Sequence, residues 1–559
     1  MQERIQEGSP VVFPARYTVF ALCILVTFVT FVLMFAVNIH FFWPFLVFGI
    51  LSLIGCFDLQ QTRHAVLRNY PVIGHFRFLF EAIRPELRQY FFESNQDGRP
   101  FSRERRSMVY DRAKNIEDVL PFGTELDVYN DHYGWVNHSI TPKPENHDEL
   151  RVTIGGPDCK QPYSASLYNI SAMSFGSLSG NAILALNKGA KAGHFYHDTG
   201  EGSVSRYHRE GGGDLVWELG SGYFGCRSAD GKFDPDKFKA QASDPQIKMI
   251  EIKMSQGAKP GHGGVLPGPK VSEEIAEARG VPVGVDCVSP ASHSAFSTPI
   301  ELLEFIQTLR ELSGGKPVGF KLCIGHRWEF MAIVKAMLKT GIKPDFIVVD
   351  GAEGGTGAAP IEFANRLGTP LLQGLLFVHN SLVATGIRDD IKLGASGKLI
   401  SAFDISGTMC LGADWVNSAR GFMFAVGCIQ SQSCHTNRCP TGVATQDHKR
   451  QQALVVPDKA ERVTNFHRNT LKSLMAFTAA AGLNHPREFK PEHFFLRGGP
   501  REIMSANAAF TWLKKGALLE EAHDLPGYSA FWAMAEADSF KPSKSLDLAK
   551  TLNHHRAHH

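Results

Sequence analysis

The sequence predicts an α/β protein built as a (β/α)8 TIM barrel and preceded by an N-terminal hairpin of two transmembrane helices. Three observations support this fold class. Eight short apolar runs alternate with helical segments from residue 168 onward, the runs end in Gly, Ser, Asp or Lys, and two long uncharged segments come first. Near-continuous apolar runs are typical of parallel strands covered by helices. An open doubly wound sheet is the alternative, but no G-x-G-x-x-G follows the first run and no G-x-x-x-x-G-K-[ST] occurs.

The two uncharged segments predict the membrane hairpin. Residues 17–37 and 41–57 carry no charge over 21 and 17 positions, enough for two spans joined by a tight turn. Arg4 and Arg16 precede the first span and Arg63 and Arg68 follow the second, so the positive-inside rule places both flanks in the cytoplasm. A cleaved signal peptide is disfavoured because the run is long and a second run follows. We expect a multi-pass protein of the inner (cytoplasmic) membrane with residues 1–16 and the catalytic domain in the cytoplasm.

Composition excludes two classes of protein. Lys and Arg number 58 against 56 Asp and Glu, so no nucleic-acid partner is expected. Ten cysteines in 559 residues are too few for a disulfide scaffold, and seven of them are scattered singly, as in a reducing compartment.

The rest of the chain divides into three expected parts. Residues 58–150 form a helical or irregular connector, which lies either along the membrane surface or against the main domain. The barrel spans 151–450, and 451–559 form a helical extension with a helix over 463–483 and a tail. The histidines that end the chain are interpreted as part of this tail rather than as a metal site.

The barrel strands are expected at the eight apolar runs, which are 168–174, 193–199, 247–254, 283–290, 318–324, 345–351, 391–397 and 415–421. Barrel enzymes carry their chemistry at the carboxyl ends of the strands. Those ends are unusually polar and rich in glycine here.

Three cysteines follow the eighth run directly. Cys428, Cys434 and Cys439 lie within residues 427–446. Zinc would need a fourth ligand, such as His435 or a distant group, whereas three thiolates match a cluster with three irons. Because barrel loops bind a cofactor phosphate at this position, a cluster here would lie near a flavin. Three ordinary loop cysteines are the alternative.

Two further features lie at predicted strand ends. Residues 350–360 read DGAEGGTGAAP, and such glycines let the backbone approach a flat or anionic ligand, although a ligand-free turn is the alternative. Lys321 ends the fifth run, where its ammonium would point into the barrel mouth. It can hold positive charge against a reduced flavin or a substrate carboxylate, or form a structural ion pair.

Six segments in this order resemble the FMN-binding synthase domain of the glutamate synthases. They are ISAMSFGSLS (170–179), DTGEGS (198–203), IKMSQGAKPGHGGVLPGPKV (252–271), FKL (320–322), GAEGGTGAAP (351–360) and GCIQSQSCHTNRCPTGVATQ (427–446). The resemblance covers about residues 150–485. The hairpin followed by RNYPVIGHFRFLFEAIRPELRQYFFES is similar to the short, membrane-anchored bacterial members of that family.

The resemblance implies FMN in the barrel and a [3Fe-4S] cluster on Cys428, Cys434 and Cys439. It implies that 2-oxoglutarate and ammonia give 2-iminoglutarate, which takes hydride from reduced FMN to yield glutamate. Lys321 and Glu201 are expected as the catalytic pair, the first supplying charge and the second proton transfer or imine positioning. The matching positions for cofactor binding are Ala172, Met173, Ser174, Gln256, Lys321, Gly354, Gly355, Gly357, Gly397, Ser418 and Ala419.

The chain also departs from the large glutamate synthases. We expect neither a glutaminase domain nor a β-helical domain, and no nucleotide-binding fingerprint is present. Ammonia, free or from a separate amidotransferase, and electrons from ferredoxin, a flavoprotein subunit or quinone must then come from outside. Residues 259–264 and 289–294 differ from the family's KPGEGG-like and SPPPHHD-like runs. A membrane-linked FMN-dependent dehydrogenase of a 2-hydroxy acid or an amine is therefore the alternative, and an inactive tethered scaffold is disfavoured by the intact cysteines and Lys321.

Overall fold

The computed structural model describes residues 15–131, 133–146, 150–499, 502–520 and 525–543. The chain forms two compact units, residues 1–103 and 104–559. Most of the predicted cytoplasmic N-terminus and the histidines at the end of the chain lie outside the described residues. The predicted connector is divided between the units, since its first part belongs to the N-terminal unit and its second part to the barrel unit.

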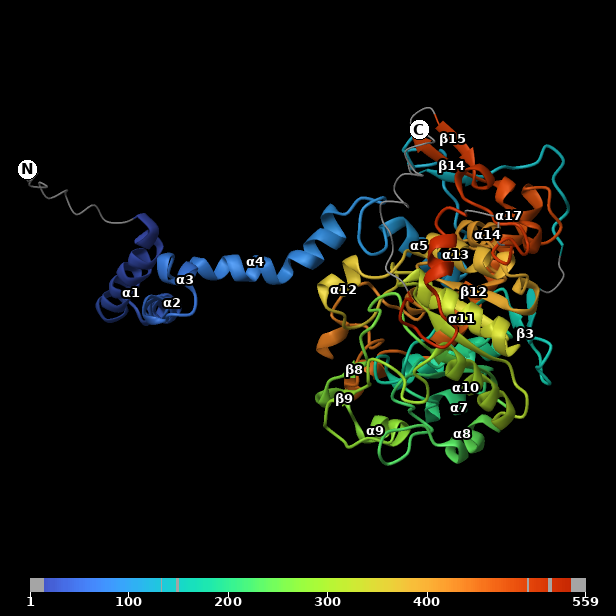
Figure 1. Ribbon diagram of the computed structural model, residues 1–559. Helices are drawn as coiled ribbons and strands as arrows, with labels where there is room; N and C mark the ends of the chain where they lie inside the picture. The colour runs from blue at the N-terminus through green and yellow to red at the C-terminus, as the bar shows by residue number, and fades with distance from the viewer. Residues whose placement is uncertain (1–14, 132, 147–149, 500–501, 521–524, 544–559) are drawn as a thin grey trace, which may run out of the picture. The chain divides into compact units, whose positions relative to one another are not determined.

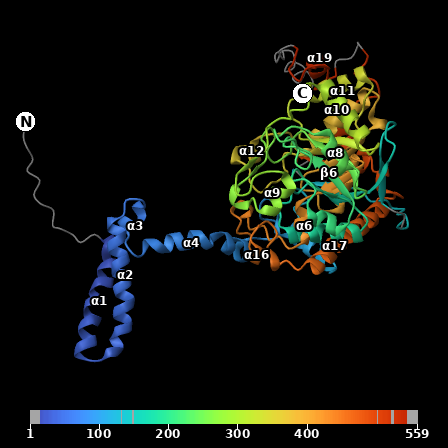
Figure 2. The same ribbon diagram turned by 90° about the horizontal axis from the view of Figure 1, so that it is seen from below.

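The N-terminal unit is built on two long apolar helices, as predicted. Helices α1 (Thr18–Ala36) and α2 (Phe42–Gln60) pack side by side (Figures 1 and 2). They are joined through a 3-10 turn, η2 (Ile39–Phe41), whose start is capped by the Asn38 side chain. With their flanking turns, the helices run Ala15–Ala36 and Ile39–Gln60, 22 residues each, and most of their side chains are exposed. By length and composition both are able to cross a bilayer.

Short helices complete this unit. Helix α3 (Ala65–Asn69) is followed by α4 (Gly74–Leu87) and a π-helical turn, η3 (Arg88–Phe92). The buried carboxylate of Asp58 accepts a hydrogen bond from the Val72 amide at 2.9 Å and lies 2.9 Å from His75 Nε2, which ties the α3–α4 turn to α2.

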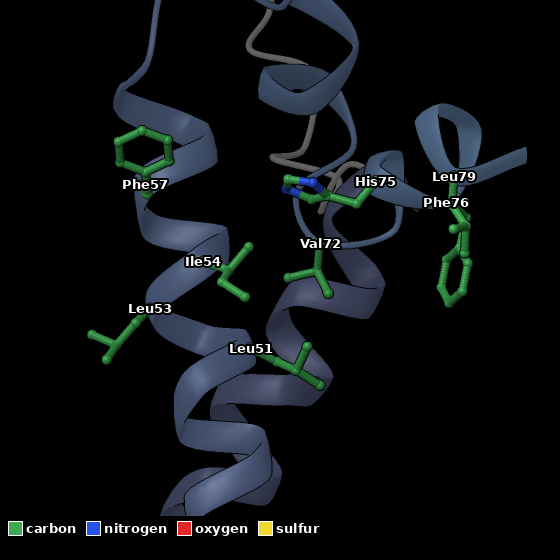
Figure 3. Close-up of a pocket in the computed structure, with 8 residues that line it drawn as sticks. All are labelled: Leu51, Leu53, Ile54, Phe57, Val72, His75, Phe76 and Leu79. Atoms are coloured by element: carbon green, nitrogen blue, oxygen red, sulfur yellow. The ribbon is translucent and has the colours of Figure 1, made fainter. Parts of the chain in front are cut away.

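A groove of about 680 Å³ lies between α2 and this turn (Figure 3). It is lined by Leu51, Leu53, Ile54, Phe57, Val72, His75, Phe76 and Leu79. The groove contains none of the predicted site residues, and its apolar lining suits lipid contact rather than polar chemistry.

The second unit is a closed barrel of eight parallel strands, which confirms the predicted fold class. The ring closes where Val416 pairs with Tyr168. In order around the barrel, the strands are β4 (Tyr168–Ile170), β5 (His197–Asp198), β6 (Leu215–Leu219), β7 (Ile247–Lys253), β10 (Val318–Leu322), β11 (Phe346–Asp350), β12 (Lys392–Ser396) and β13 (Trp415–Ser418).

One predicted strand is wrong and one barrel strand was missed. Residues 283–290 do not enter the barrel: Cys287–Val288 form β9, which pairs antiparallel with β8 (Val265–Leu266). Gly284 breaks the run with φ of +71°, and Val283, Val285 and Val288 are all exposed. The third barrel strand is instead β6, five residues that are all buried. The sequence did not predict β6 because the strand is short and contains a glutamate.

Helices cover the outside of the barrel. They are α6 (Gly180–Ala192), α7 (Arg206–Gly211), α8 (Pro235–Ala242), α10 (Pro299–Leu312), α11 (Arg327–Thr340), α13 (Leu371–Ala384), α14 (Ala402–Cys410) and α17 (Val456–Ala480). Side chains cap the starts of five of them, α6, α7, α8, α10 and α14. In α10, the Thr298 hydroxyl accepts from the Glu301 amide while the Glu301 carboxylate accepts from the Thr298 amide.

Helix α17 packs against α6 (Figure 2) and against α14 (Figure 1). It therefore lies between the first and seventh barrel helices and is the eighth helix of the barrel. Because α17 begins at Val456, the barrel extends beyond the boundary expected at residue 450. The helix expected at 463–483 begins seven residues earlier, at Val456, next to a proline that suits the first turn.

Further elements attach to the barrel. Strands β2 (Arg151–Ile154) and β3 (Tyr163–Ser166) form a hairpin. Strands β1 (Gly134–Val136), β14 (Phe494–Gly499) and β15 (Glu502–Ser505) form an antiparallel sheet (Figure 1). This sheet joins the expected connector to the expected C-terminal extension, a pairing that the sequence did not predict. The remaining helices are α5 (Arg103–Lys114), α9 (Glu273–Arg279), α12 (Ile361–Arg366), α15 (Arg420–Ala425), α16 (His448–Gln452), α18 (Ala506–Ala509) and α19 (Ser529–Met534).

Candidate active site at the carboxyl end of the barrel

Four ionisable side chains from four strands meet inside the barrel. The ammonium of Lys321 on β10 contacts the Glu218 carboxylate on β6, lies 2.9 Å from Glu251 Oε1 on β7 and 4.0 Å from Asp198 Oδ2 on β5. Strands β5 and β10 are separated by two strands, so their side chains can meet only across the interior. All four residues are buried. We refer to Asp198, Glu218 and Glu251 as the acidic trio.

Burial and mutual repulsion disfavour the ionised forms of Asp198 and Glu251. Burial raises the pKa of Asp198 well above its ordinary value, with Glu251 adding to the rise. Burial likewise raises the pKa of Glu251 to about 7, against the opposing effect of Lys321. Burial lowers the pKa of Lys321, but Glu218, Glu251 and Asp198 outweigh it and raise that pKa well above normal. Lys321 thus stays charged at neutral pH, whereas burial favours the protonated forms of Asp198 and Glu251.

The second predicted catalytic residue lies in another charged layer, nearer the mouth. Glu201 Oε2 is 2.8 Å from Lys253 Nζ at the end of β7. Burial would raise the pKa of Glu201, but Lys253, Arg279 and Lys259 together lower it to about 2. Glu201 is therefore a fixed carboxylate at neutral pH. Of its two expected roles, this environment favours positioning a charged group over proton transfer.

The loops predicted to line a flavin pack against one another. Ala172, Met173 and Ser174 follow β4, and an added Cβ at Gly200, whose φ is +65°, would lie 2.6 Å from the Ser174 nitrogen. Gly200 is therefore required for the close approach of the DTGEGS loop.

Gln256 lies on the loop after β7. Its neighbour Gly257 donates its amide to Asp350 Oδ2 at 2.7 Å, which ties this loop to the start of the glycine-rich segment. The structure thus brings Gln256 to the same end of the barrel as the loop after β11.

The glycine-rich loop after β11 lies against the cysteine loop after β13. An added Cβ at Gly355 would be 2.5 Å from Arg420 Nη1, and one at Gly357 would be 3.6 Å from Cys434 Cβ. Arg420 Nη2 also donates to the Glu353 carbonyl at 3.0 Å. Burial lowers the pKa of Arg420 to about 10, so the guanidinium remains charged between the two loops.

The three cysteines are unpaired thiols that influence one another. Burial, together with Cys434 and Cys439, raises the pKa of Cys428 to about 12, although a hydrogen bond from the Gln430 amide opposes the rise. Burial would also raise the pKa of Cys439. Hydrogen bonds from the amides of Ala444, Thr441 and Val443 and from the Thr441 hydroxyl outweigh burial and lower that pKa below its ordinary value. Lys270 adds positive charge, since its ammonium donates to the Cys434 carbonyl at 2.9 Å.

This donor set fits a cluster better than a single ion. Among the described residues, the acidic trio is the group of three possible metal ligands whose donor atoms all lie within 4.8 Å of one another. The three cysteine sulfurs do not meet that distance limit. Sulfurs around one zinc would lie about 3.8 Å apart, given Zn–S bonds of about 2.3 Å. More widely spaced thiols with nearby cations and amide donors suit separate irons of a cluster.

The residues expected at a phosphate lie at the seventh and eighth strand ends. Gly397 follows β12 with φ of +155°, Ser418 ends β13, and Ala419 precedes α15. The Ser418 carbonyl accepts from the Ser171 amide at 3.0 Å, which joins this end to the segment after β4.

Several site residues were not identified from sequence. Glu218 was missed because its strand was missed. Glu251 and Lys253 lie two positions apart on a strand that was identified, and this alternation could have predicted that both point inward. Arg420 and Lys270 carried no signal, because their proximity to the cysteines depends on loop packing.

The closed parallel barrel, with charged residues and glycine-rich loops at its carboxyl end, defines a (β/α)8-barrel domain. Residues 148–484 match the family described as the conserved region in glutamate synthase, and the chain belongs to that family.

A glutamate synthase large subunit-like protein, YerD of Bacillus subtilis, is 40% identical over 482 residues, covering 79% of this chain and 91% of that protein. An archaeal-type glutamate synthase [NADPH] of Thermotoga neapolitana is 34% identical over 329 residues, covering 59% of this chain and 62% of that protein. Among solved structures, a flavocytochrome b2 mutant with pyruvate bound gives a TM-score of 0.41 at 13% identity, covering 81% of this chain and 91% of that chain.

Proposed function

We propose that the chain reduces 2-iminoglutarate, formed from 2-oxoglutarate and ammonia, to glutamate as an FMN- and iron–sulfur-dependent oxidoreductase. The observation that carries the proposal is the meeting of the glycine loop and the cysteine loop through Gly355, Gly357 and Arg420 at the mouth above Lys321. A flavin loop and a cluster loop in contact suit the transfer of single electrons into a two-electron centre.

The residues of the mouth would divide the work of holding the cofactors. Segment 172–174, Gln256 and the glycines at 354, 355 and 357 would line the flavin ring, and Gly397, Ser418 and Ala419 its phosphate. Cys428, Cys434 and Cys439 would hold a [3Fe-4S] cluster. FMN, when bound, supplies hydride transfer and exchanges electrons singly with a cluster. Lys321 would place its positive charge near the pyrimidine edge of the ring.

The upper charged layer suits a dicarboxylate with an imine nitrogen. Lys253, Lys259 and Arg279 supply three cations around Glu201, enough to bind substrate carboxylates as well as this side chain. The fixed negative charge of Glu201 would in turn attract and orient a protonated imine. Glu201 thereby acts on the position of the reacting carbon rather than as its proton donor.

Electrons and ammonia would come from other proteins or small molecules. Ferredoxin, a separate flavoprotein subunit or membrane quinone would reduce the cluster, and ammonia would be free or come from a separate amidotransferase. The two apolar helices would anchor the chain in the inner membrane with the barrel in the cytoplasm. Retention of the full-length chain in membranes after alkaline carbonate extraction tests this location.

The reaction can be tested on protein purified in detergent. After chemical reduction, 2-oxoglutarate with ammonia should reoxidise the flavin and yield glutamate, whereas Lys321→Met should retain the spectrum but lose at least about 100-fold in rate. Glu304→Gln, on the exposed side of α10, is the matched control. Absence of glutamate with reduced flavin present would refute the named reaction. Flavin reduction by a 2-hydroxy acid or an amine without ammonia would replace it with a dehydrogenase.

A further inference from the structure

We propose that the acidic trio and Lys321 form a redox-linked proton site, in which the trio positions the ammonium and takes up one proton when the bound flavin is reduced. The inference rests on the proposed function because it requires FMN at the mouth of the barrel. It assigns Asp198, Glu218 and Glu251 as positioning residues that act through Lys321.

Geometry fixes the ammonium from three sides. The Lys321 side chain is buried, and carboxylates from β5, β6 and β7 surround its nitrogen. Glu218 and Glu251 are direct neighbours in the β6–β7 register, so the sheet itself holds their carboxylates together. A lysine side chain on its own has four flexible bonds. The trio removes that freedom and keeps the charge at one height in the barrel.

The charges in this layer do not balance unless protons are bound. Three carboxylates against one ammonium would leave two negative charges in a buried site, which is costly. Two of the three carboxyl groups must therefore be protonated in the resting state. Two other titratable groups interact with this layer. The Asp350 carboxylate on β11 interacts with Lys321, and the Tyr196 phenol interacts with Glu251 and Asp198. Neither supplies a compensating positive charge.

Reduction of the flavin changes this balance. A bound flavin that has taken up two electrons and one proton would carry one negative charge, and the Lys321 ammonium would be shared between that charge and the last ionised carboxylate. That carboxylate would then take up a second proton from solvent, so that two electrons enter with two protons. Loss of hydride to the imine carbon would remove the negative charge, and the trio would then release its proton to solvent. Atoms and charges thus balance over one turnover.

The midpoint potential of the bound FMN measures this directly. Each proton taken up with two electrons contributes about 30 mV per pH unit, because a tenfold change in a two-electron equilibrium equals that potential. Between about pH 6 and pH 8, full-length protein in detergent should show about 59 mV per pH unit. The triple variant Asp198→Asn/Glu218→Gln/Glu251→Gln removes every carboxyl group of the trio that could take up the proton and should lower the slope to about 30 mV, while the control Glu304→Gln should keep the wild-type slope.

Three results would overturn the inference. They are a wild-type slope of about 30 mV per pH unit, an unchanged slope in the triple variant, and a reduced flavin whose absorption spectrum shows the second proton on the ring itself. If the triple variant does not fold, the wild-type slope and the spectrum of the reduced flavin still decide the question. Failure of the proposed function looks different, since purified protein would then lack FMN or make no glutamate, whereas the slope requires only bound FMN.

Discussion

The contact between Gly355 and Arg420 allows a sharp test of the flavin loop. Replacing Gly355 with Ala adds a Cβ that would lie 2.5 Å from Nη1, 2.6 Å from Cζ and 3.0 Å from Nε of Arg420. Gly355 is not one of the described glycines with a positive φ. Its backbone conformation therefore tolerates alanine. The cost therefore arises from the guanidinium, which must move away from the loop.

The magnitude follows from what the guanidinium loses. Its Nη2 donates to the Glu353 carbonyl at 3.0 Å, and a hydrogen bond from a charged donor contributes about 1.5–3 kcal/mol. If the loop can bind FMN only in its present conformation, this energy is lost from binding. Since about 1.4 kcal/mol is a factor of ten in affinity, the Kd for FMN should rise about 10- to 100-fold.

The assay is a titration of flavin-free protein with FMN, followed by flavin fluorescence. Gly499→Ala is a matched control, because an added Cβ there meets no atom within 4 Å. Thermal unfolding of the flavin-free proteins separates a local effect from loss of the fold. A Kd in Gly355→Ala within about twofold of the wild-type value, less than 0.5 kcal/mol, would show that this loop does not contact the cofactor and would refute the reasoning.

Three other changes test separate parts of the molecule. Cys439→Ser should lower bound iron and the EPR signal while FMN content stays unchanged, with exposed Cys56→Ser as the control. Asp345→Ala should destabilise the barrel by about 3–5 kcal/mol, measured by denaturant unfolding, because buried Arg310 would lose a partner 3.1 Å away. Glu201→Gln should make the free energy of unfolding depend less on pH below about pH 4.5. The folded pKa of Glu201 is about 2 against an ordinary 4.5. Its carboxylate therefore contributes at most about 3 kcal/mol above pH 4.5, and this contribution is lost as the pH falls toward 2.

The barrel was predictable because seven of its strands are apolar runs that the helices bury. The remaining strand, β6, carries Glu218 as the fourth of its five residues, and local pattern gives no reason to place a carboxylate inside a barrel. The false strand at 283–290 shows the opposite error, since its valines are exposed. Apolar composition predicts burial only where a covering element exists, and that depends on the whole fold.

Site prediction divided along similar lines. Residues within contiguous motifs, such as Gly355 and the cysteines, could be proposed from the sequence because backbone and thiol chemistry leave a local pattern. Arg420 and Lys270 were missed because each reaches its partner through a loop contact distant in sequence. The hydrogen bond from the Tyr110 hydroxyl on α5 to the Cys428 carbonyl at 2.7 Å is of the same kind.

The two charged layers of the barrel give two glutamates opposite properties. Glu251 lies among carboxylates with one ammonium, and burial raises its pKa to about 7. Glu201 lies among three cations, which outweigh its burial and lower its pKa to about 2. A carboxyl group exchanges protons near neutral pH only in the first environment. Motif position pointed to Glu201 for proton transfer or imine positioning, and the charges around the two residues favour proton exchange in the lower layer and positioning in the upper one. Lys321 belongs to the lower layer, so in the proposed enzyme its charge and the protons beside it would respond to a bound flavin together.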